Sequence, residues 1–165
     1  SHSDDDRGVD AAPVPLEPRL WVGSCAAAVD HAALHRLGIT AVLTCAAGLV
    51  AVATGPRPGA APLLNETPPH HALLPLLDTP SETFAGLRDA LVWLQATLAQ
   101  GHTILVHCIQ GISRSVAVVC AHLLHANRVS TVAAALESIR AVRPTARPLP
   151  THVLYLRREY ESPQQ

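Results

Sequence analysis

Short apolar runs recur along the chain and are separated by longer segments in which apolar residues recur with helical spacing. The runs are rich in β-branched and other apolar residues and are bounded by glycine or polar residues. Such runs are typical of strands buried on both faces of a sheet. The pattern predicts strands at Leu20–Gly23, Ile39–Cys45, Ala72–Leu77 and Ile104–Val106.

Helix start and stop signals fall between these runs. Residues 79–82, Thr-Pro-Ser-Glu, have the form of a capping box with proline at the first helical position. Gly38 and Gly101 stand where glycine commonly ends a helix. The predicted helices span residues 26–37, 80–99 and 114–125, then a segment from a cap at Ser130 or Thr131 to just before Pro144, and finally residues 151–160.

Strands that alternate with helices indicate an α/β domain. We expect a central, mostly parallel, twisted sheet of about five strands flanked by helices. Residues 15–161 are expected to form one domain, because the length of 165 residues suits a single compact unit. Residues 1–14, which begin with a possible cloning remnant and include an acidic run, are expected to be a disordered tail, and residues 162–165 a second tail.

The stretch Thr54–Pro69 interrupts this order. It is rich in proline, which excludes a regular helix and predicts a long surface loop. His70 and His71 follow directly. Two adjacent histidines could belong to a metal site, but a solvent-exposed pair at the end of a proline-rich loop is the simpler interpretation, and we expect no metal.

Charge and composition narrow the classes of function. The formal net charge is -1 and 48% of residues are apolar, which argues against a general nucleic-acid binder, a membrane-surface binder and a disordered chain. The 12 basic residues are all arginine, whose planar fork suits phosphate groups. No apolar run approaches the roughly 20 residues that span a bilayer, and no secretory signal opens the chain.

The cysteines stand at positions 25, 45, 108 and 120, without the spacing of a metal site. A disulfide framework is not expected in a chain of this length and apolar content. We therefore expect a reducing compartment, the cytoplasm.

The segment Thr103–Ala117 carries the candidate chemistry. It comprises a predicted strand, His-Cys, five residues, Arg-Ser and a predicted helix. A loop between a strand end and a helix start presents N–H groups beside the positive end of the helix, and these form an anion site. Gly111 permits the backbone conformation of so tight a loop. The residues expected to bind phosphate are Ile109, Gln110, Gly111, Ile112, Ser113 and Arg114.

Cys108 is the candidate nucleophile. The positive field of the loop and helix favours its thiolate, which could attack phosphorus and form a cysteinyl-phosphate. Arg114 would grip two phosphate oxygens, and Ser115 would offer its hydroxyl to the departing sulfur. His107 would hydrogen-bond the loop backbone in a supporting role. An ordinary buried cysteine is the alternative, but the strand, glycine, arginine and helix fall in register around Cys108.

The nine residues His107–Ser115, HCIQGISRS, match the signature of the protein tyrosine phosphatases. The glycine and the Ser-Arg-Ser ending resemble the dual-specificity subgroup. The resemblance extends over about residues 16–161: residues 20–24 and 38–43 are similar to the subgroup's first strands, and Arg143-Pro144 to the close of its penultimate helix. It implies the protein tyrosine phosphatase-like fold, in an atypical stand-alone member without a cofactor.

The same resemblance implies a general acid on a loop upstream of the signature. Residues 77–80, Leu-Asp-Thr-Pro, match that loop, so Asp78 is the candidate that protonates the leaving oxygen and later activates water. Asp30 and Asp89 fall within predicted helices and fit less well, and Glu66 is the next carboxylate to consider. The stretch Ala146–Pro150 lacks the asparagine with which many members brace the catalytic loop.

The resemblance implies hydrolysis of phosphotyrosine and phosphoserine or phosphothreonine in a phosphoprotein substrate. From the composition and the cysteine pattern we also expect a cytoplasmic protein, taken as a monomer, with no nucleic-acid or membrane partner. Two alternatives stay open. One is a phosphatase for a phosphoinositide, a phosphorylated glycan or an RNA end, and the other is a catalytically silent phosphoprotein-binding module. In the family fold the strand ending at Cys45 lies beside the strand ending at Cys108, so Cys45 is also a candidate redox partner. The simpler alternative is that Cys45 packs as a small apolar residue.

Overall fold

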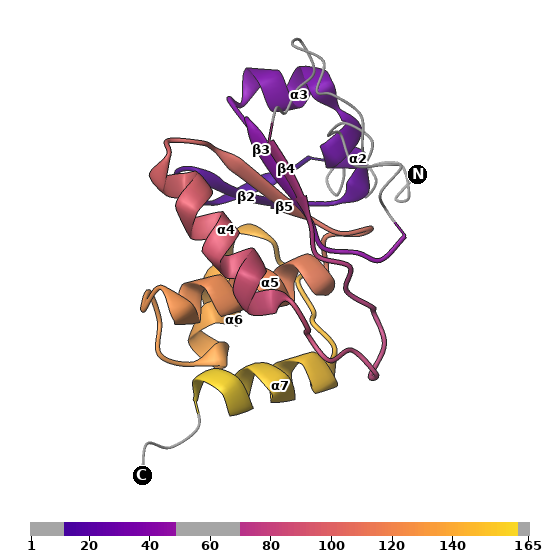
Figure 1. The fold of residues 1–165 in the computed structure, drawn as a ribbon, viewed down its shortest axis with the longest axis vertical. Helices are drawn as coiled ribbons and strands as arrows, with labels where there is room; N and C mark the ends of the chain where they lie inside the picture. The colour runs from indigo at the N-terminus through magenta and orange to yellow at the C-terminus, as the bar shows by residue number, and fades with distance from the viewer. Residues whose placement is uncertain (1–11, 49–69, 162–165) are drawn as a thin grey trace.

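A computed structural model describes residues 12–48 and 70–161 (Figure 1). Its strands are β1 (Val14–Glu17), β2 (Leu20–Gly23), β3 (Ala41–Thr44), β4 (His70–Leu73) and β5 (Ile104–His107). Its helices are α2 (Cys25–Val29), α3 (His31–Arg36), α4 (Leu87–Ala99), α5 (Arg114–His125), α6 (Val132–Val142) and α7 (Pro150–Tyr160).

The five strands form one sheet in the order β1-β2-β5-β3-β4. Strand β5 lies at the centre and pairs in parallel with β2 and β3, and β3 pairs in parallel with β4. Among the described strands, only β1 is antiparallel to its neighbour. The predicted α/β class with a mostly parallel, five-stranded sheet is confirmed, and the carboxyl ends of four strands meet at one edge.

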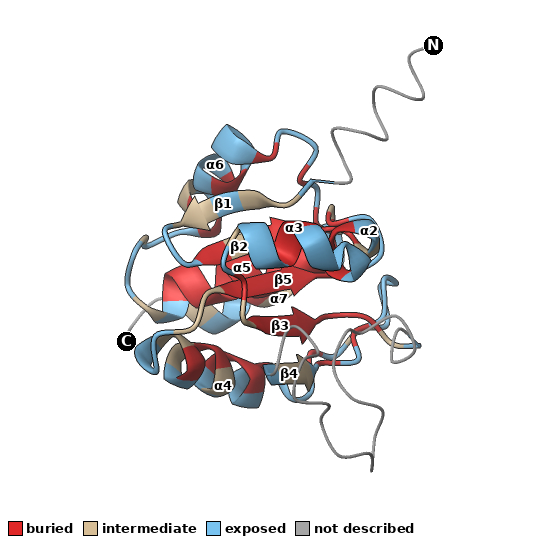
Figure 2. Ribbon diagram, turned by 90° about the horizontal axis from the view of Figure 1, so that it is seen from above, coloured by how far each residue is buried: buried red, intermediate tan, exposed pale blue. Residues whose placement is uncertain are grey.

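Helices cover both faces of the sheet (Figure 1). Alternate residues of β5 point to opposite faces: Ile104 and Val106 join the core beneath α4 to α7, whereas Leu105 joins the core beneath α2 and α3. Strands β3 and β5 are buried throughout, whereas helices such as α3 and α6 expose their outer faces (Figure 2). Helix α5 is itself buried from Arg114 to Leu124, so its start is held firmly beside the end of β5.

The predicted helix over residues 26–37 is two helices. Asp30 ends α2 with a ψ of 79°, outside the helical range, and its side chain accepts a hydrogen bond from the Ala33 N–H at 3.0 Å to start α3. Gly38, with a φ of 72°, ends α3 as predicted.

The predicted helix over residues 80–99 begins only at Leu87. Phe84 and Gly86 adopt φ values of 58° and 86°, in the left-handed region that a right-handed helix excludes. The Glu82 carboxylate does not close a capping box. It accepts hydrogen bonds from the N–H groups of Leu77, at 2.7 Å, and Phe84, and thereby closes a compact turn.

The strand predicted at Ala72–Leu77 lies at His70–Leu73 instead. The histidine pair therefore opens a strand rather than ending a loop, and His71 lies 3.1 Å from the Thr44 hydroxyl. The predicted proline-rich loop at 54–69 falls outside the described residues, as do Glu66, residues 1–11 and residues 162–165. The other predicted strands and helices are confirmed within a few residues of their ends.

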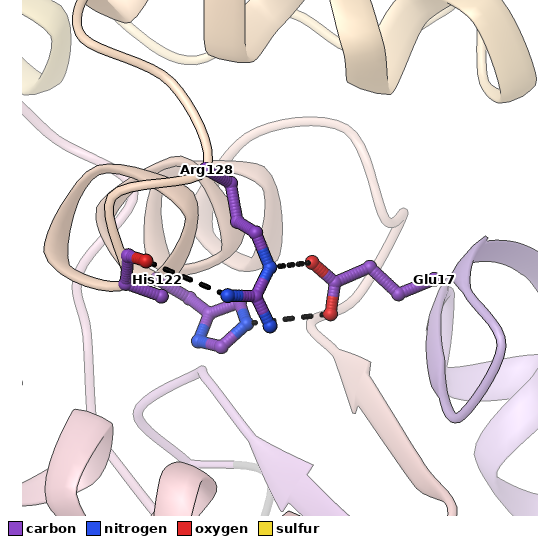
Figure 3. A network of polar contacts seen from close by, with 4 residues as sticks. Glu17, His122 and Arg128 are labelled. Carbon is purple, nitrogen blue, oxygen red and sulfur yellow. Dashed lines mark hydrogen bonds and ion pairs between the residues drawn. The ribbon is translucent and has the colours of Figure 1, made fainter.

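Strand β1, which the sequence did not predict, is tied to α5 by a polar cluster (Figure 3). The Glu17 carboxylate lies 3.2 Å from Arg128 Nε and 3.7 Å from His122 Nε2. His122 is buried, and burial lowers its pKa against the opposing effect of Glu17. None of the helices in the described ranges is long and apolar enough to cross a bilayer.

Candidate active site

The loop between β5 and α5 is held in place by donors outside it, which hydrogen-bond to its backbone carbonyl groups. The Arg143 side chain, buried behind the loop, donates from Nε to the Gly111 carbonyl at 2.6 Å and from Nη2 to the Gln110 carbonyl at 2.8 Å. The N–H of Cys25 donates to the Ile109 carbonyl at 2.9 Å, and the N–H of Arg147 to the Ile112 carbonyl at 2.7 Å.

Because these four carbonyls turn outward, the N–H groups of the loop are left for a ligand. In the described part of the chain, none of the N–H groups of residues 109–113 donates to another backbone carbonyl. Together with the N-terminus of α5 they form an anion site.

Gly111 allows the loop to approach the sheet closely. Its φ is 70°, and a Cβ there would lie 2.6 Å from the Gly23 carbonyl oxygen and 2.8 Å from Arg143 Nη2. No other residue fits without moving the loop or its brace. The predicted role of Gly111 in the turn is consistent with this geometry.

Cys108 lies at the floor of the loop. Its side chain is 2% exposed, and Sγ lies 3.2 Å from the Ser115 hydroxyl. Arg114 is also buried and donates from Nη1 to the Leu76 carbonyl at 3.3 Å. Arg114 Nε and the Ser113 hydroxyl have no hydrogen-bond partner among the described residues, as expected of donors placed for an anion.

A pocket of about 370 Å³ opens above Cys108. Asp78, which is exposed on the segment between β4 and α4, lines the same pocket. The structure thus brings Asp78 to the same pocket as Cys108 and Arg114, which lie thirty or more positions later in the sequence. The residues that line the pocket are Asp78, Cys108, Ile109, Gln110, Ile112, Ser113, Arg114, Arg147 and Leu149.

His107 is fully buried, and burial lowers its pKa to about 4, so its ring is neutral near pH 7. Nδ1 lies 3.1 Å from the Cys108 carbonyl, which can only accept, so Nδ1 carries the hydrogen. Nε2 then accepts from the Thr44 hydroxyl at 2.8 Å. The Thr44 oxygen can accept in turn from His71 Nε2. The predicted support of the loop by His107 agrees with these contacts.

The segment that carries Asp78 is anchored on helix α7. The Phe84 ring stacks on the Tyr155 ring, with centroids 4.5 Å apart, and meets the His152 ring edge-on at 5.1 Å. His152 is buried, and burial lowers its pKa. The anchor fixes one end of the acid loop, while the Arg114–Leu76 hydrogen bond fixes the other.

Cys45 follows β3 and is fully buried. Burial raises its pKa well above the ordinary value, and the neighbouring Cys108 adds to the increase. All four cysteines are free thiols. Cys45 and Cys108 follow the paired residues Thr44 and His107 and so stand at neighbouring strand ends, and their redox partnership stays a prediction.

Sequence reasoning missed that residues 143–149 hydrogen-bond to the phosphate-binding loop. Arg143 was identified only as part of the Arg-Pro pair that closes a helix, yet its side chain braces the loop. The loop is braced without an asparagine at Ala146–Pro150. Arg147-Pro148 repeats the Arg-Pro pair four residues later, and this repeat is the signal that could have revealed Arg147. No cluster of three potential metal ligands occurs within residues 12–48 and 70–161.

Comparison with known proteins adds independent information. Residues 20–162 match the family described as "Dual specificity phosphatase, catalytic domain". Dual specificity phosphatase 28 of Homo sapiens is 33% identical over 147 residues, which cover 85% of this chain and 76% of that protein.

Dual specificity protein phosphatase 12 of Mus musculus is 31% identical over 135 residues. The match covers 81% of this chain but only 37% of that longer protein. Among solved structures, human DUSP28 superposes with a TM-score of 0.75 at 27% identity, over 91% of this chain and 93% of the other.

Proposed function

Since the chain belongs to the dual specificity phosphatase family, we propose that it hydrolyses phosphate monoesters of phosphotyrosine and of phosphoserine or phosphothreonine in proteins, through a cysteinyl-phosphate on Cys108. One observation carries the proposal. Cys108 Sγ lies at the floor of a pocket that is lined by unpaired loop N–H groups, by Arg114 and by Asp78.

In the first step the loop N–H groups and Arg114 hold three phosphate oxygens. The Cys108 thiolate attacks phosphorus, a sulfur–phosphorus bond forms, and the bond from phosphorus to the ester oxygen breaks. Asp78 donates its proton to that leaving oxygen, which departs as a tyrosine, serine or threonine hydroxyl. The loop and Arg114 stabilise the charge that develops on the equatorial oxygens.

In the second step the Asp78 carboxylate takes a proton from water. The water oxygen bonds to phosphorus, the sulfur–phosphorus bond breaks, and inorganic phosphate leaves. The Ser115 hydroxyl, 3.2 Å from Sγ, donates a hydrogen bond to the sulfur as its negative charge returns. Ser115 thereby stabilises the leaving thiolate, the role proposed for it from the sequence.

The test compares wild type with Cys108→Ser and Asp78→Asn on p-nitrophenyl phosphate and on matched phosphotyrosine, phosphoserine and phosphothreonine peptides. We expect Cys108→Ser to fall below about a hundredth of the wild-type rate while still binding phosphopeptide. Asp78→Asn should lower peptide turnover by roughly 10² to 10⁴. Its effect should be smaller on p-nitrophenyl phosphate, whose leaving group needs little protonation.

Phosphoinositides, phosphorylated glycans and RNA 5′ ends belong in the same panel. Turnover of one of these in preference to all peptides would reject the phosphoprotein substrate but keep the chemistry. Binding of phosphopeptides without turnover of any ester would reject the enzyme and favour a binding module.

We further propose a cytoplasmic monomer, which the four free thiols support through their preference for a reducing compartment. Light scattering at micromolar concentration and cell fractionation test these two points. A dimer mass or a membrane-bound fraction would contradict them.

A further inference from the structure

The pocket contains a second arginine besides Arg114. Arg147 lines the same pocket but, unlike Arg114, is exposed. The only other charged residue among the described lining residues is Asp78. The pocket therefore carries one more positive group than the proposed reaction uses.

Among the described residues, the backbone of Arg147 is hydrogen-bonded to the loop but its side chain has no polar partner. Its N–H donates to the Ile112 carbonyl at 2.7 Å, which ties the residue directly to the phosphate-binding loop. Pro148, which is buried, follows it and restricts the chain. Across residues 12–48 and 70–161, the guanidinium of Arg147 has neither a hydrogen bond nor an ion pair, whereas the Arg88, Arg128 and Arg143 side chains are engaged.

The two guanidinium groups differ in what they can reach. Arg114 is buried at the floor, with one nitrogen on the Leu76 carbonyl and Nε left for the reacting phosphate. Arg147 lines the pocket and is exposed, so its guanidinium is accessible to a group of the substrate that adjoins the phosphate. A guanidinium fork pairs well with either a carboxylate or a second phosphate.

We propose that Arg147 is a specificity-determining residue that selects phosphoprotein segments with a second anionic group beside the phosphorylated residue. The inference rests on the proposed function, for which it names the substrate class. That second group is an aspartate or glutamate side chain, or a neighbouring phosphorylated residue. Because Arg147 is exposed, we expect a selectivity of about 3- to 10-fold that weakens as salt is raised.

The test uses two phosphotyrosine peptides that differ only in having aspartate or asparagine on both sides of the phosphotyrosine. For each enzyme the readout is the ratio of kcat/KM on the aspartate peptide to kcat/KM on the asparagine peptide. Using a ratio within one enzyme removes any general loss of activity. Wild type is compared with Arg147→Gln, Arg147→Lys and Arg147→Glu. The control is Arg36→Ala, which removes an exposed arginine of helix α3 that does not line the pocket.

We expect a ratio above about three in wild type and Arg36→Ala, near one in Arg147→Gln, below one in Arg147→Glu, and intermediate in Arg147→Lys. The change should lie mainly in KM. A wild-type ratio near one, or the same ratio in Arg147→Gln as in wild type, would overturn the inference. Selectivity that depends on Arg147 only for phosphoinositide vesicles would also overturn it.

Peptide binding by Cys108→Ser, with and without Arg147→Gln, separates this inference from the proposed function. If the enzyme turns over no ester but binding still favours the aspartate peptide through Arg147, the proposed function fails and the inference stands. If esters are hydrolysed but neither binding nor kcat/KM depends on Arg147, the inference fails and the proposed function stands.

Discussion

At the scale of single residues, two glycines with nearly the same φ angle have very different surroundings. Gly38 and Gly111 have φ values of 72° and 70°, in the left-handed region. A Cβ on Gly38 would meet nothing within 4 Å, whereas one on Gly111 would lie 2.6 Å from a backbone oxygen. Comparing an alanine substitution at each position therefore separates the free-energy cost of a left-handed backbone from the cost of a steric clash.

We therefore predict different outcomes for the same substitution. Gly38→Ala should lower the free energy of unfolding by about 1 to 2 kcal/mol, the cost of a left-handed alanine, and leave turnover near wild type. Gly111→Ala should lower it further and also impair phosphopeptide binding, because the loop must move from Gly23 and Arg143. Urea unfolding and phosphopeptide titration measure both. Equal effects of the two substitutions would contradict this account of the loop.

The sequence could predict the residues of the signature, because their types and spacing reflect local chemistry. It could not predict the partners that Thr44 and Arg143 provide, since hydrogen bonds between residues 63 and 32 positions apart depend on the finished fold. Nothing in the sequence around Thr44, apart from its place at a strand end, indicated that it would hydrogen-bond to His107. Only the sheet register, which pairs Thr44 with His107, reveals its role.

At the scale of elements, helix α7 supports the segment that carries Asp78. The contact runs through Phe84, whose ring stacks on Tyr155 and meets His152 edge-on, both residues of α7. The sequence predicted a helix where this turn occurs because residues 79–82 resemble a capping box. The prediction failed because Glu82 binds the Leu77 and Phe84 N–H groups instead.

Phe84→Leu should test this support. Leucine keeps apolar volume but loses the stacking on Tyr155, so the acid loop should become less well placed. We predict that turnover of aryl phosphates with poor leaving groups falls several-fold more than turnover of p-nitrophenyl phosphate, which serves as the internal control. A rate series across leaving groups measures the effect. A uniform loss across the series would instead indicate a general loss of stability.

At the scale of the whole molecule, the fold buries several neutral histidines. Burial lowers the pKa values of His107, His122 and His152, and that of His107 falls from 6.5 to about 4. In the unfolded chain these rings take up protons near pH 6.5, but in the folded protein they resist protonation. Stability is therefore complete above about pH 6.5 and is lost as the pH falls toward 4.

For His107 alone the difference in pKa corresponds to about 3 kcal/mol. We predict that the free energy of unfolding falls by at least about 2 kcal/mol between pH 7.5 and pH 4.5. Urea denaturation at a series of pH values measures it. A stability that is unchanged or greater at pH 4.5 would mean that these histidines are not buried as neutral rings.

The α/β class of the described residues could be predicted because buried, strand-like apolar runs are separated by segments with helical spacing. The parallel register then brings the ends of β2, β3 and β5 to one edge, where Gly23, Cys45 and Cys108 stand. The sequence could not predict that residues 143–149, which follow α6, lie against the loop at that edge. Their contacts with the loop are made by the backbone N–H of Arg147 and the buried guanidinium of Arg143.

The most direct test of the central proposal is to capture the phosphate on the enzyme. Asp78→Asn should still accept phosphate from p-nitrophenyl phosphate but should release it slowly, since no carboxylate activates water. After rapid denaturing quench and proteolysis, mass spectrometry should find one phosphate on the peptide that contains Cys108, and none in Cys108→Ser. Phosphate on another residue, or p-nitrophenol release in Cys108→Ser at the wild-type rate, would contradict nucleophilic catalysis by Cys108.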